Sequence, residues 1–426
     1  MKDYDVVIIG GGITGTATLY ALTHYTSIKR IAIIEKYRRL AQLNTDKDQN
    51  SQTLHFGDIE TNYTAERSRS VNAKTELTRK YLEAHKSERL FTKSHKMVIG
   101  VGKEEVAALE KRYKEIKSIY PKLRKLDPGQ IAKIEPKVIE GRDPKEPIIA
   151  LMSPDGYNVD FGRLAESYEQ HSRKHDTYFG MKVWSLKREG KWWVVKRGKE
   201  GLRARVVIVA TGADSLLFAH RAGYAKHWIL LPVAGSFYTA PSLLKGKVYT
   251  VQAKKLPFAA VHGDPDVVNP HETRFGPTAK VLPMTERYHY GSVLDFLRLF
   301  RFRMDATLSL INIISDPILL RYILNNVLYD IPYIGTYFFM KQNVRKIVPK
   351  VKFSQIRFGR RLGGLRPQLV DTRKKSLEFG DAKVFGDNAI FDITPSPGAS
   401  VALWNGIENA KKAAEFLGKE KKNRKG

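Results

Sequence analysis

The feature that most constrains this chain is a glycine-rich turn between an apolar strand and a helix at the N-terminus. Asp5–Ile9 is rich in β-branched residues, which is typical of a strand buried on both faces. The pattern G-x-G-x-x-G follows at once, with its glycines at Gly10, Gly12 and Gly15. In a dinucleotide-binding fold these glycines permit, in turn, a tight turn, close approach to a pyrophosphate and close packing of helix on strand. Thr16–Tyr25 is predicted to form that helix, with its N-terminus towards the phosphates.

A second strand and an acidic residue complete the pattern. Arg30–Ile34 is again apolar, and it ends at Glu35, 20 residues after Gly15. An acid at this spacing accepts hydrogen bonds from the hydroxyls of a ribose. Because a strand, a helix, a second strand and a terminal acid accompany the glycines, the N-terminal segment is predicted to bind a dinucleotide.

Two later stretches indicate that the dinucleotide is FAD. Arg205–Ala213 is another buried strand, and it runs into the sequence A-T-G, as in FAD enzymes of the glutathione-reductase-like class, which this stretch resembles. At Ala389–Ser400 a strand ends in a turn fixed by two prolines, and Ser400–Leu417 is predicted to be a helix closed by Gly418. The N-terminus of such a helix can lie beneath a flavin, where its dipole stabilises negative charge on the reduced ring.

These separated elements predict an α/β fold with a glutathione-reductase-like, Rossmann-type FAD-binding domain built from discontinuous segments. The remaining chain is expected to form an α+β substrate or cap domain, with strands at Met97–Val101 and Leu230–Tyr238 and an exposed helix at Glu104–Lys117. The predicted boundaries are residues 1–75, 150–232 and 355–420 for the FAD domain, 76–149 and 233–354 for the substrate domain, and 421–426 for a basic tail.

Composition restricts the chemistry further. The chain of 426 residues contains no cysteine, which excludes disulfides, thiolate metal sites, iron–sulfur clusters and a cysteinyl-linked cofactor. We expect non-covalent FAD and no metal. The formal net charge of +29 predicts an anionic partner, such as a membrane surface or small acidic substrates, or reflects a general adaptation of the proteins in its cell.

Several stretches resemble the malate:quinone oxidoreductase family, within the D-amino-acid-oxidase-like group of flavoproteins. The stretches that carry the resemblance are Asn50–Thr64, Pro232–Tyr238, Pro257–Pro265, Thr273–Ala279, Gly363–Gln368 and Thr394–Ser400. The resemblance implies that FAD takes a hydride from C2 of (S)-malate, giving oxaloacetate, and that the electrons pass to a membrane quinone. It also implies that the cofactor is held by residues of these stretches and of the nucleotide fold, namely Gly10, Gly12, Gly15, Glu35, Asn50, Ser51, Gln52, Thr211, Gly212, Gly364, Pro397, Gly398, Ala399 and Ser400.

The proton of the substrate hydroxyl requires a base, and two histidines are candidates. His262 lies in V-H-G-D-P, and Asp264 shares its face if the segment is extended, so that the acid can orient the imidazole. His262 is the first candidate and His55 the second. His55 lies in Asn50–Thr64, which contains no lysine or arginine that would hold the substrate carboxylate in the wrong place.

Arg274 and Arg366 are the predicted carboxylate ligands. Arginine offers a planar fork that matches a carboxylate with two hydrogen bonds, and both residues lie beside glycine or proline rather than on a helical face. Two such ligands favour malate, which has two carboxylates, over lactate, which has one.

The segment 292–340 is the most apolar part of the chain, with Arg298, Arg301 and Arg303 among its aromatic residues. Such a helix can lie in the headgroup plane of a bilayer or pack as a cap, and we expect core packing for most of it, with the rim touching lipid. No uninterrupted apolar stretch is long enough to predict a spanning helix. The predicted location is peripheral, on the cytoplasmic face of the cell membrane.

Other functions remain open at this point. The same fold and chemistry also suit lactate or 2-hydroxyglutarate as the substrate, or oxygen as the acceptor. A nucleic-acid-binding flavoprotein is a more distant alternative, but the chain carries no nucleic-acid-binding motif, so no nucleic acid is expected as a partner.

Overall fold

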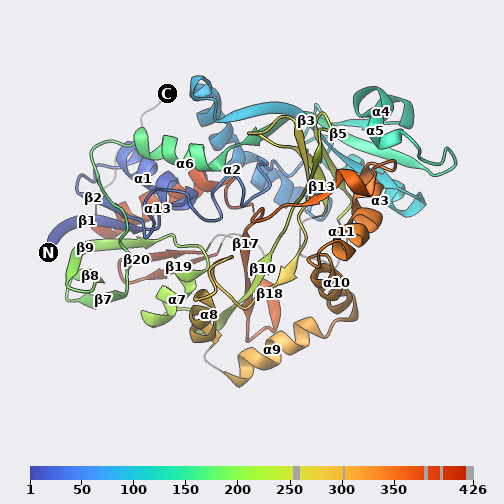
Figure 1. The fold of residues 1–426 in the computed structure, drawn as a ribbon. Coiled ribbons are helices and arrows are strands. Elements are labelled where there is room, and N and C mark those ends of the chain that lie inside the picture. The colour runs from blue at the N-terminus through green and yellow to red at the C-terminus, as the bar shows by residue number, and fades with distance from the viewer. Residues whose placement is uncertain (253–259, 301–302, 379–381, 394–396, 419–426) are drawn as a thin grey trace.

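The first sheet joins strands from widely separated parts of the chain (Figure 1). The computed structural model describes residues 1–252, 260–300, 303–378, 382–393 and 397–418. The sheet has the order β19–β20–β9–β1–β2–β6, and β20, β9, β1, β2 and β6 run parallel. Its strands are β1 (Lys2–Ile9), β2 (Ile31–Ile34), β6 (Asp176–Tyr178), β9 (Glu200–Val209), β19 (Lys383–Gly386) and β20 (Ala389–Asp392), with β7 (Ser185–Glu189) and β8 (Trp192–Arg197) continuing from β9.

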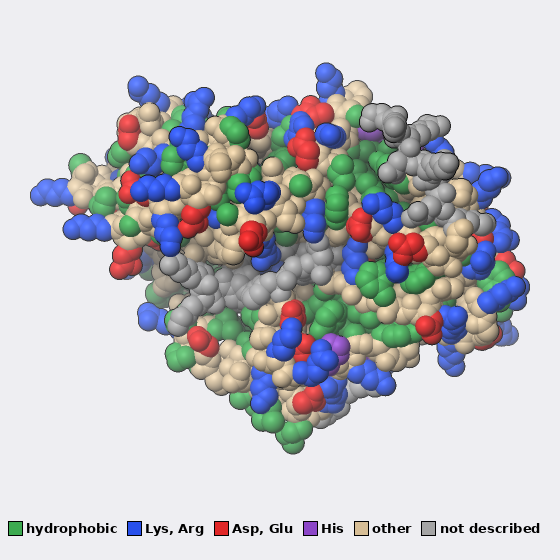
Figure 2. Space-filling view, turned by 180° about the vertical axis from the view of Figure 1, so that it is seen from behind, with side chains coloured by type: hydrophobic (Ala, Val, Ile, Leu, Met, Phe, Trp, Pro, Cys, Tyr) green, Lys and Arg blue, Asp and Glu red, His purple; other side chains and the backbone are tan. Residues whose placement is uncertain are grey.

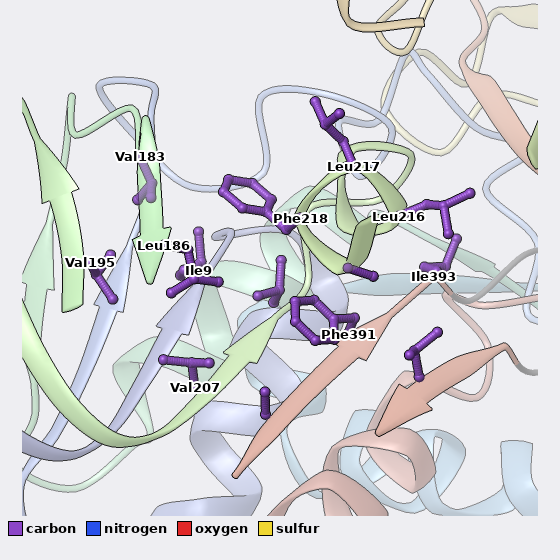
Figure 3. Close-up of a cluster of buried hydrophobic side chains, with 14 of the residues drawn as sticks. Ile9, Val183, Leu186, Val195, Val207, Leu216, Leu217, Phe218, Phe391 and Ile393 are labelled. Atoms are coloured by element: carbon purple, nitrogen blue, oxygen red, sulfur yellow. The ribbon is translucent and has the colours of Figure 1, made fainter. Parts of the chain in front are cut away.

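Strand β1 is buried on both faces, as its β-branched sequence predicts. Alternate residues point to opposite sides, so that Val6 and Ile8 join one apolar cluster and Val7 and Ile9 join another. Figure 3 shows Ile9 in the second cluster, together with residues of β9, β20 and α7 (Asp214–Arg221). Complete burial of such a side chain contributes roughly 1.5–3 kcal/mol, which explains why both faces must be covered by other elements.

Helices α1 (Ile13–Tyr25) and α13 (Ala402–Leu417) cover the face formed by Val6 and Ile8. They approach closely, because a Cβ on Gly406 would lie only 2.6 Å from the backbone oxygen of Ala17. The predicted helix closed by Gly418 is confirmed, with Gly418 at φ 66°.

Two further sheets lie beside the first. The second sheet has the order β16–β11–β14–β13–β12–β3–β5–β4, and the third has the order β15–β10–β17–β18. The second contains β3 (Phe91–Val101), β4 (Arg124–Leu126), β5 (Ile148–Val159), β11 (Tyr238–Pro241), β12 (Lys247–Thr250), β13 (His262–Pro265), β14 (Glu272–Gly276) and β16 (Arg357–Phe358). The third contains β10 (Trp228–Ala234), β15 (Lys280–Val281), β17 (Leu365–Asp371) and β18 (Ser376–Glu378).

The prediction of one strand over Leu230–Tyr238 is wrong. Strand β10 ends at Ala234 in the third sheet, and β11 begins at Tyr238 in the second. The chain crosses between the sheets at Gly235, where a Cβ would lie 2.7 Å from a side-chain carbon of Pro277. A continuous apolar sequence does not reveal that its two halves belong to different sheets.

The remaining helices lie around the sheets. They are α2 (Ala65–Ala84), α3 (Lys103–Ile116), α4 (Pro128–Ile134), α5 (Pro136–Ile139), α6 (Phe161–Gln170), α8 (Ser292–Phe300), α9 (Met304–Ile314), α10 (Pro317–Leu328), α11 (Ile334–Phe339) and α12 (Arg345–Ile347), with the short helices η1 (Lys86–Glu88), η2 (Met340–Val344) and η3 (Phe353–Gln355). The strand predicted at Met97–Val101 and the helix predicted at Glu104–Lys117 correspond to β3 and α3.

The expectation of core packing for most of 292–340 holds for only one face of α9 and α10, which packs on a buried cluster through residues such as Ala306, Leu319 and Ile323. Their buried residues are Ala306 and Ser309 in α9, and Leu319 and Asn326 in α10, while large apolar side chains stay exposed. No single helix among the described residues is long and apolar enough to cross a membrane. Helices α9 and α10 meet that criterion only when taken together, across a bend of 85°.

Candidate active site

A large cavity lies at the carboxyl ends of β1, β2 and β9, where open α/β sheets bind their ligands. Its volume is about 460 Å³. The predicted site residues that line it are Gly10, Gly12, Glu35, Asn50, Ser51, His55, Thr211, Gly212, His262, Gly364, Arg366, Pro397, Gly398, Ala399 and Ser400. Gly15, Gln52, Asp264 and Arg274 are not among the lining residues.

The glycine turn after β1 can be formed only by residues without a side chain. Gly10 has φ +111°, and a Cβ there would lie 2.4 Å from the backbone oxygen of Ala210. A Cβ on Gly15 would lie 1.9 Å from the backbone oxygen of Gly10, so Gly15 permits helix packing rather than cofactor contact. At Gly12 the nearest atom to such a Cβ is Thr45 Oγ1 at 3.2 Å, which leaves the backbone accessible from the cavity.

The N-terminus of α1 and the carboxylate of Glu35 are both presented to the cavity. The N-cap residue Gly12 provides no side-chain cap, and the amide of Ile13 donates to Thr45 Oγ1 at 3.1 Å. Thr14, the next residue of α1, lines the cavity, so the helix N-terminus faces the place where an anion would bind. Glu35 accepts hydrogen bonds from the amides of Gly11 at 2.8 Å and Tyr37 at 2.9 Å, which fix its carboxylate at the end of β2. This arrangement suits a pyrophosphate at α1 and a ribose at Glu35.

The loop that contains Asn50 and Gln52 is held by its own side chains. The side-chain Nδ2 of Asn50 donates to the backbone oxygen of Asp46 at 2.8 Å, and its Oδ1 accepts from the backbone amide of Gln52 at 2.9 Å. Gln52 is buried, donates to the backbone oxygen of Lys47, and accepts from the amide of Val267. Gln52 therefore shapes the loop behind the cavity wall, in contrast to the predicted contact with the cofactor.

His262 and Asp264 share one face of β13, as predicted for an extended segment. Nδ1 of His262 lies 2.7 Å from Oδ2 of Asp264, and Lys247 Nζ lies 3.4 Å from the other carboxylate oxygen. Burial lowers the pKa of His262, although Asp264 acts in the opposite direction. Burial alone would raise the pKa of Asp264, but His262 and Lys247 outweigh it and the pKa is lowered. The site thus holds a neutral imidazole beside a buried anion, with Nε2 left to take a proton.

His55 has an acidic partner of its own. Its Nδ1 lies 2.5 Å from Oε1 of Glu60, and its backbone amide donates to Ser400 Oγ at 2.9 Å. Burial alone would raise the pKa of Glu60, but the hydrogen bond to His55 and its charge lower that pKa to about 2. Glu60 also lines the cavity. Sequence reasoning missed Glu60, although it lies within the same cation-free segment as His55.

Arg366 lines the cavity from β17 without an acidic partner among the described residues. Burial lowers its pKa, and the nearby phenols of Tyr63 and Tyr322 act in the opposite direction. A second cation, Arg67 at the start of α2, also lines the cavity, with Cζ 4.3 Å from the centroid of the Tyr63 ring. Burial raises the pKa of Tyr63 to about 12, and both Arg67 and Arg366 act against this rise, so both guanidinium groups lie near that ring. The signal missed in the sequence is that Arg67 is the first cation after the cation-free segment.

Arg274 lies on β14 and is turned away from substrate contact. Its guanidinium donates to the backbone oxygens of Lys47 at 3.2 Å and Asn50 at 3.1 Å, and to Asp266 at 3.3 Å. It also lies over the ring of Phe237 at 4.6 Å. Both terminal nitrogens therefore have protein partners, and its predicted role as a carboxylate ligand finds no support in this geometry.

The residues present fit FAD. The cavity combines a glycine turn, the N-terminus of α1, Glu35 after β2, and a second glycine turn after β9 at Gly212, which has φ +63°. Beyond this dinucleotide region, the same cavity contains His262 and Arg366. The fold and the site together define an FAD-dependent oxidoreductase of the D-amino-acid-oxidase-like group.

The chain belongs to the malate:quinone oxidoreductase family. The family model described as malate:quinone oxidoreductase matches residues 2–415. A protein of Helicobacter pylori named malate:quinone oxidoreductase is 38% identical over 430 residues, covering 98% of this chain and 95% of that protein. A probable malate:quinone oxidoreductase of Campylobacter jejuni is 39% identical over 435 residues, covering 98% of this chain and 97% of that protein. The family resemblance read from the sequence is confirmed.

Solved structures confirm the predicted fold class. An FAD-bound L-α-glycerophosphate oxidase from Mycoplasma pneumoniae superposes with a TM-score of 0.66 and 17% identity, covering 100% of this chain and 97% of that one. A glycine oxidase from Geobacillus kaustophilus also gives 0.66, with 16% identity and coverage of 97% and 95%. At these identities the comparison concerns the fold alone.

Proposed function

We propose which residues of this chain, a member of its family, act when it oxidises (S)-malate to oxaloacetate and passes the electrons to a quinone. FAD, when bound in the cavity, supplies the acceptor for the hydride that leaves C2. Malate loses this hydride and its hydroxyl proton, while the quinone gains two electrons and two protons. The residues of the chain must therefore hold a dianion and accept one proton.

His262 is the proposed base for the hydroxyl proton. Its lowered pKa keeps the imidazole neutral near pH 7, and Asp264 stabilises the imidazolium that forms. Asp264 needs no contact with the substrate for this role, which agrees with its position behind the cavity wall. His55, paired with Glu60, is the second candidate.

Arg366 and Arg67 are the proposed ligands of the two carboxylates. Both line the cavity, and neither has an acidic partner among the described residues. A substrate carboxylate would supply the missing partner, with two hydrogen bonds from each planar fork. Arg274 has the separate role of holding the loop at Lys47 and Asn50 in place.

The FAD is proposed to bind non-covalently, as the absence of cysteine first suggested. Asn50 and Ser51 line the cavity as neutral residues, which do not compete for the substrate anion, and the Asn50 side chain holds the loop in place. Acid precipitation of the holoenzyme tests this, because a non-covalent flavin stays in the supernatant and a linked flavin goes into the pellet.

The proposed location is the cytoplasmic face of the membrane, where the protein would be held peripherally. The net charge of +29 supports attraction to anionic headgroups, and a lipid-dissolved quinone requires the enzyme to be at the bilayer. The predicted basic tail lies outside the described residues.

The observation that carries the proposal is that Arg366, which has no acidic partner among the described residues, and His262, whose pKa is lowered by burial, line the same cavity as the dinucleotide turn. The test is to add malate anaerobically to the holoenzyme and to follow the flavin absorbance. Malate is expected to bleach it, and lactate at the same concentration to do so much more slowly. Bleaching by lactate or 2-hydroxyglutarate but not by malate would overturn the substrate assignment.

A further inference from the structure

Helices α9 and α10, with α11, form a surface on which apolar side chains face outwards. Met304, Leu308 and Ile311 of α9 and Ile318, Leu320 and Leu324 of α10 are all exposed, with Met304 at 72% and Leu324 at 60%. We call this the α9–α11 surface. In Figure 1 α9 lies at the lower end of the molecule, and Figure 2 shows hydrophobic side chains at that end beside Lys and Arg side chains. Large apolar side chains exposed together on neighbouring helices indicate an interaction surface.

The charges on this surface favour an anionic bilayer as the partner. Arg321 on α10 and Lys341 and Arg345 beyond α11 are exposed and form no ion pair with a described acidic residue. The acids nearby are already engaged, since Asp305 pairs with Arg303 and Asp316 caps the N-terminus of α10. Exposed apolar side chains on helices that also carry, or lead into, exposed cations suit shallow insertion between headgroups and acyl chains. A second copy would bring the same cations against one another.

The opposite face of α10 contacts the wall of the cavity. Asn326 Oδ1 accepts a hydrogen bond from the amide of Ala279 at 2.6 Å, and Ala279 lines the cavity. Tyr322, also on α10, lies near enough to Arg366 to raise the pKa of that guanidinium against the effect of burial. A single helix thus separates the exposed apolar surface from the cavity.

We infer that the α9–α11 surface inserts into the headgroup region of an anionic bilayer, and that the lipid-dissolved quinone approaches the cavity past α10. The inference rests on the proposed function, because it takes the acceptor to be dissolved in lipid. It differs from attraction by net charge alone, which requires no particular surface and no apolar contact.

The test uses the holoenzyme with L308Q, I311Q and L324Q combined, and V268Q with F385Q as the matched control. Val268 and Phe385 are similarly exposed, at 52% and 51%, but lie elsewhere on the chain. Binding is measured by flotation with vesicles of phosphatidylglycerol and phosphatidylcholine, and activity is measured with malate and either a soluble dye or a long-chain quinone in the vesicles. The triple variant is expected to lose at least tenfold in vesicle affinity and in quinone-dependent rate, with dye-dependent rate kept within twofold.

Several outcomes would overturn the inference. They are vesicle binding by the triple variant equal to that of the control, complete release of the parent protein by high salt, or a concentration-dependent dimer that no longer forms in the triple variant. If the triple variant also loses dye activity, a second variant that combines R321E, K341E and R345E is used to test the inference. This variant leaves the apolar side chains intact and is expected to detach from vesicles at a lower salt concentration than the parent protein. Failure of the parent to reduce the dye with malate refutes the proposed function instead.

Discussion

Replacing Arg366 by lysine tests the assignment of the carboxylate ligand most directly. The substitution keeps the positive charge and removes the planar fork, so that a two-bond contact becomes a single one. Because Arg366 has no acidic partner among the described residues, no buried carboxylate is left behind and the loss falls on the substrate. A hydrogen bond between charged groups contributes about 1.5–3 kcal/mol, which corresponds to a rise in the KM for malate of roughly 10- to 150-fold.

The assay is malate-dependent dye reduction, with kcat and KM determined separately. A ligand that binds ground state and transition state alike changes KM more than kcat. Arg373→Lys is the control, since Arg373 is exposed, does not line the cavity, and would keep its charge beside Asp371, from which it lies 3.2 Å away. An unchanged KM in Arg366→Lys, or an equal rise in the control, would refute the reasoning.

Three further outcomes are expected. If Arg67 binds the carboxylate that lactate lacks, Arg67→Gln should raise the KM for malate at least tenfold while leaving the KM for lactate nearly unchanged, and equal effects on both substrates would argue against that assignment. Asp264→Asn should lower kcat roughly 100-fold. It should also move the acid limb of the pH–rate profile to lower pH, because the substitution removes the anion that raises the pKa of His262. An acid limb that stays in place would contradict His262 as the base. Folding lowers the pKa of Glu60 from 4.5 to about 2, so its contribution to the free energy of unfolding is present above pH 4.5 and is lost as the pH falls towards 2. Glu60→Gln should therefore flatten the pH dependence of urea unfolding in this window, and a dependence identical to that of the parent would argue against the pairing with His55.

The nucleotide fold was predictable because its signals are local. The Gly10 turn, the β-branched strands and the helix closed by Gly418 each depend on residues adjacent in sequence, and the structure has them where they were expected. His262 and Asp264 were predictable for the same reason, since residues two apart on a strand share a face. The domain boundaries stay a prediction.

The errors arose where distant segments decide the outcome. Whether Arg274 meets a substrate or a backbone depends on the loop at Lys47 and Asn50, more than 220 residues away. Whether the apolar side chains of α9 are exposed depends on how other elements pack around this helix. The sequence of α9 alone does not contain that information. Arg67 lies on α2 and Arg366 on β17, and both lie near Tyr63 only in the folded chain. Arg67 was overlooked because the sequence does not show this proximity.

The packing of α13 on α1 has a consequence for biosynthesis. Thr18 and Asn409 are hydrogen-bonded at 3.2 Å although 391 positions apart, and Pro397–Ser400 complete the cavity from the C-terminal end. During translation the glycine turn leaves the ribosome long before the helix that must cover it. The cavity is therefore complete only when nearly the whole chain has been synthesised, and until then one apolar face of the sheet lacks the helix that covers it.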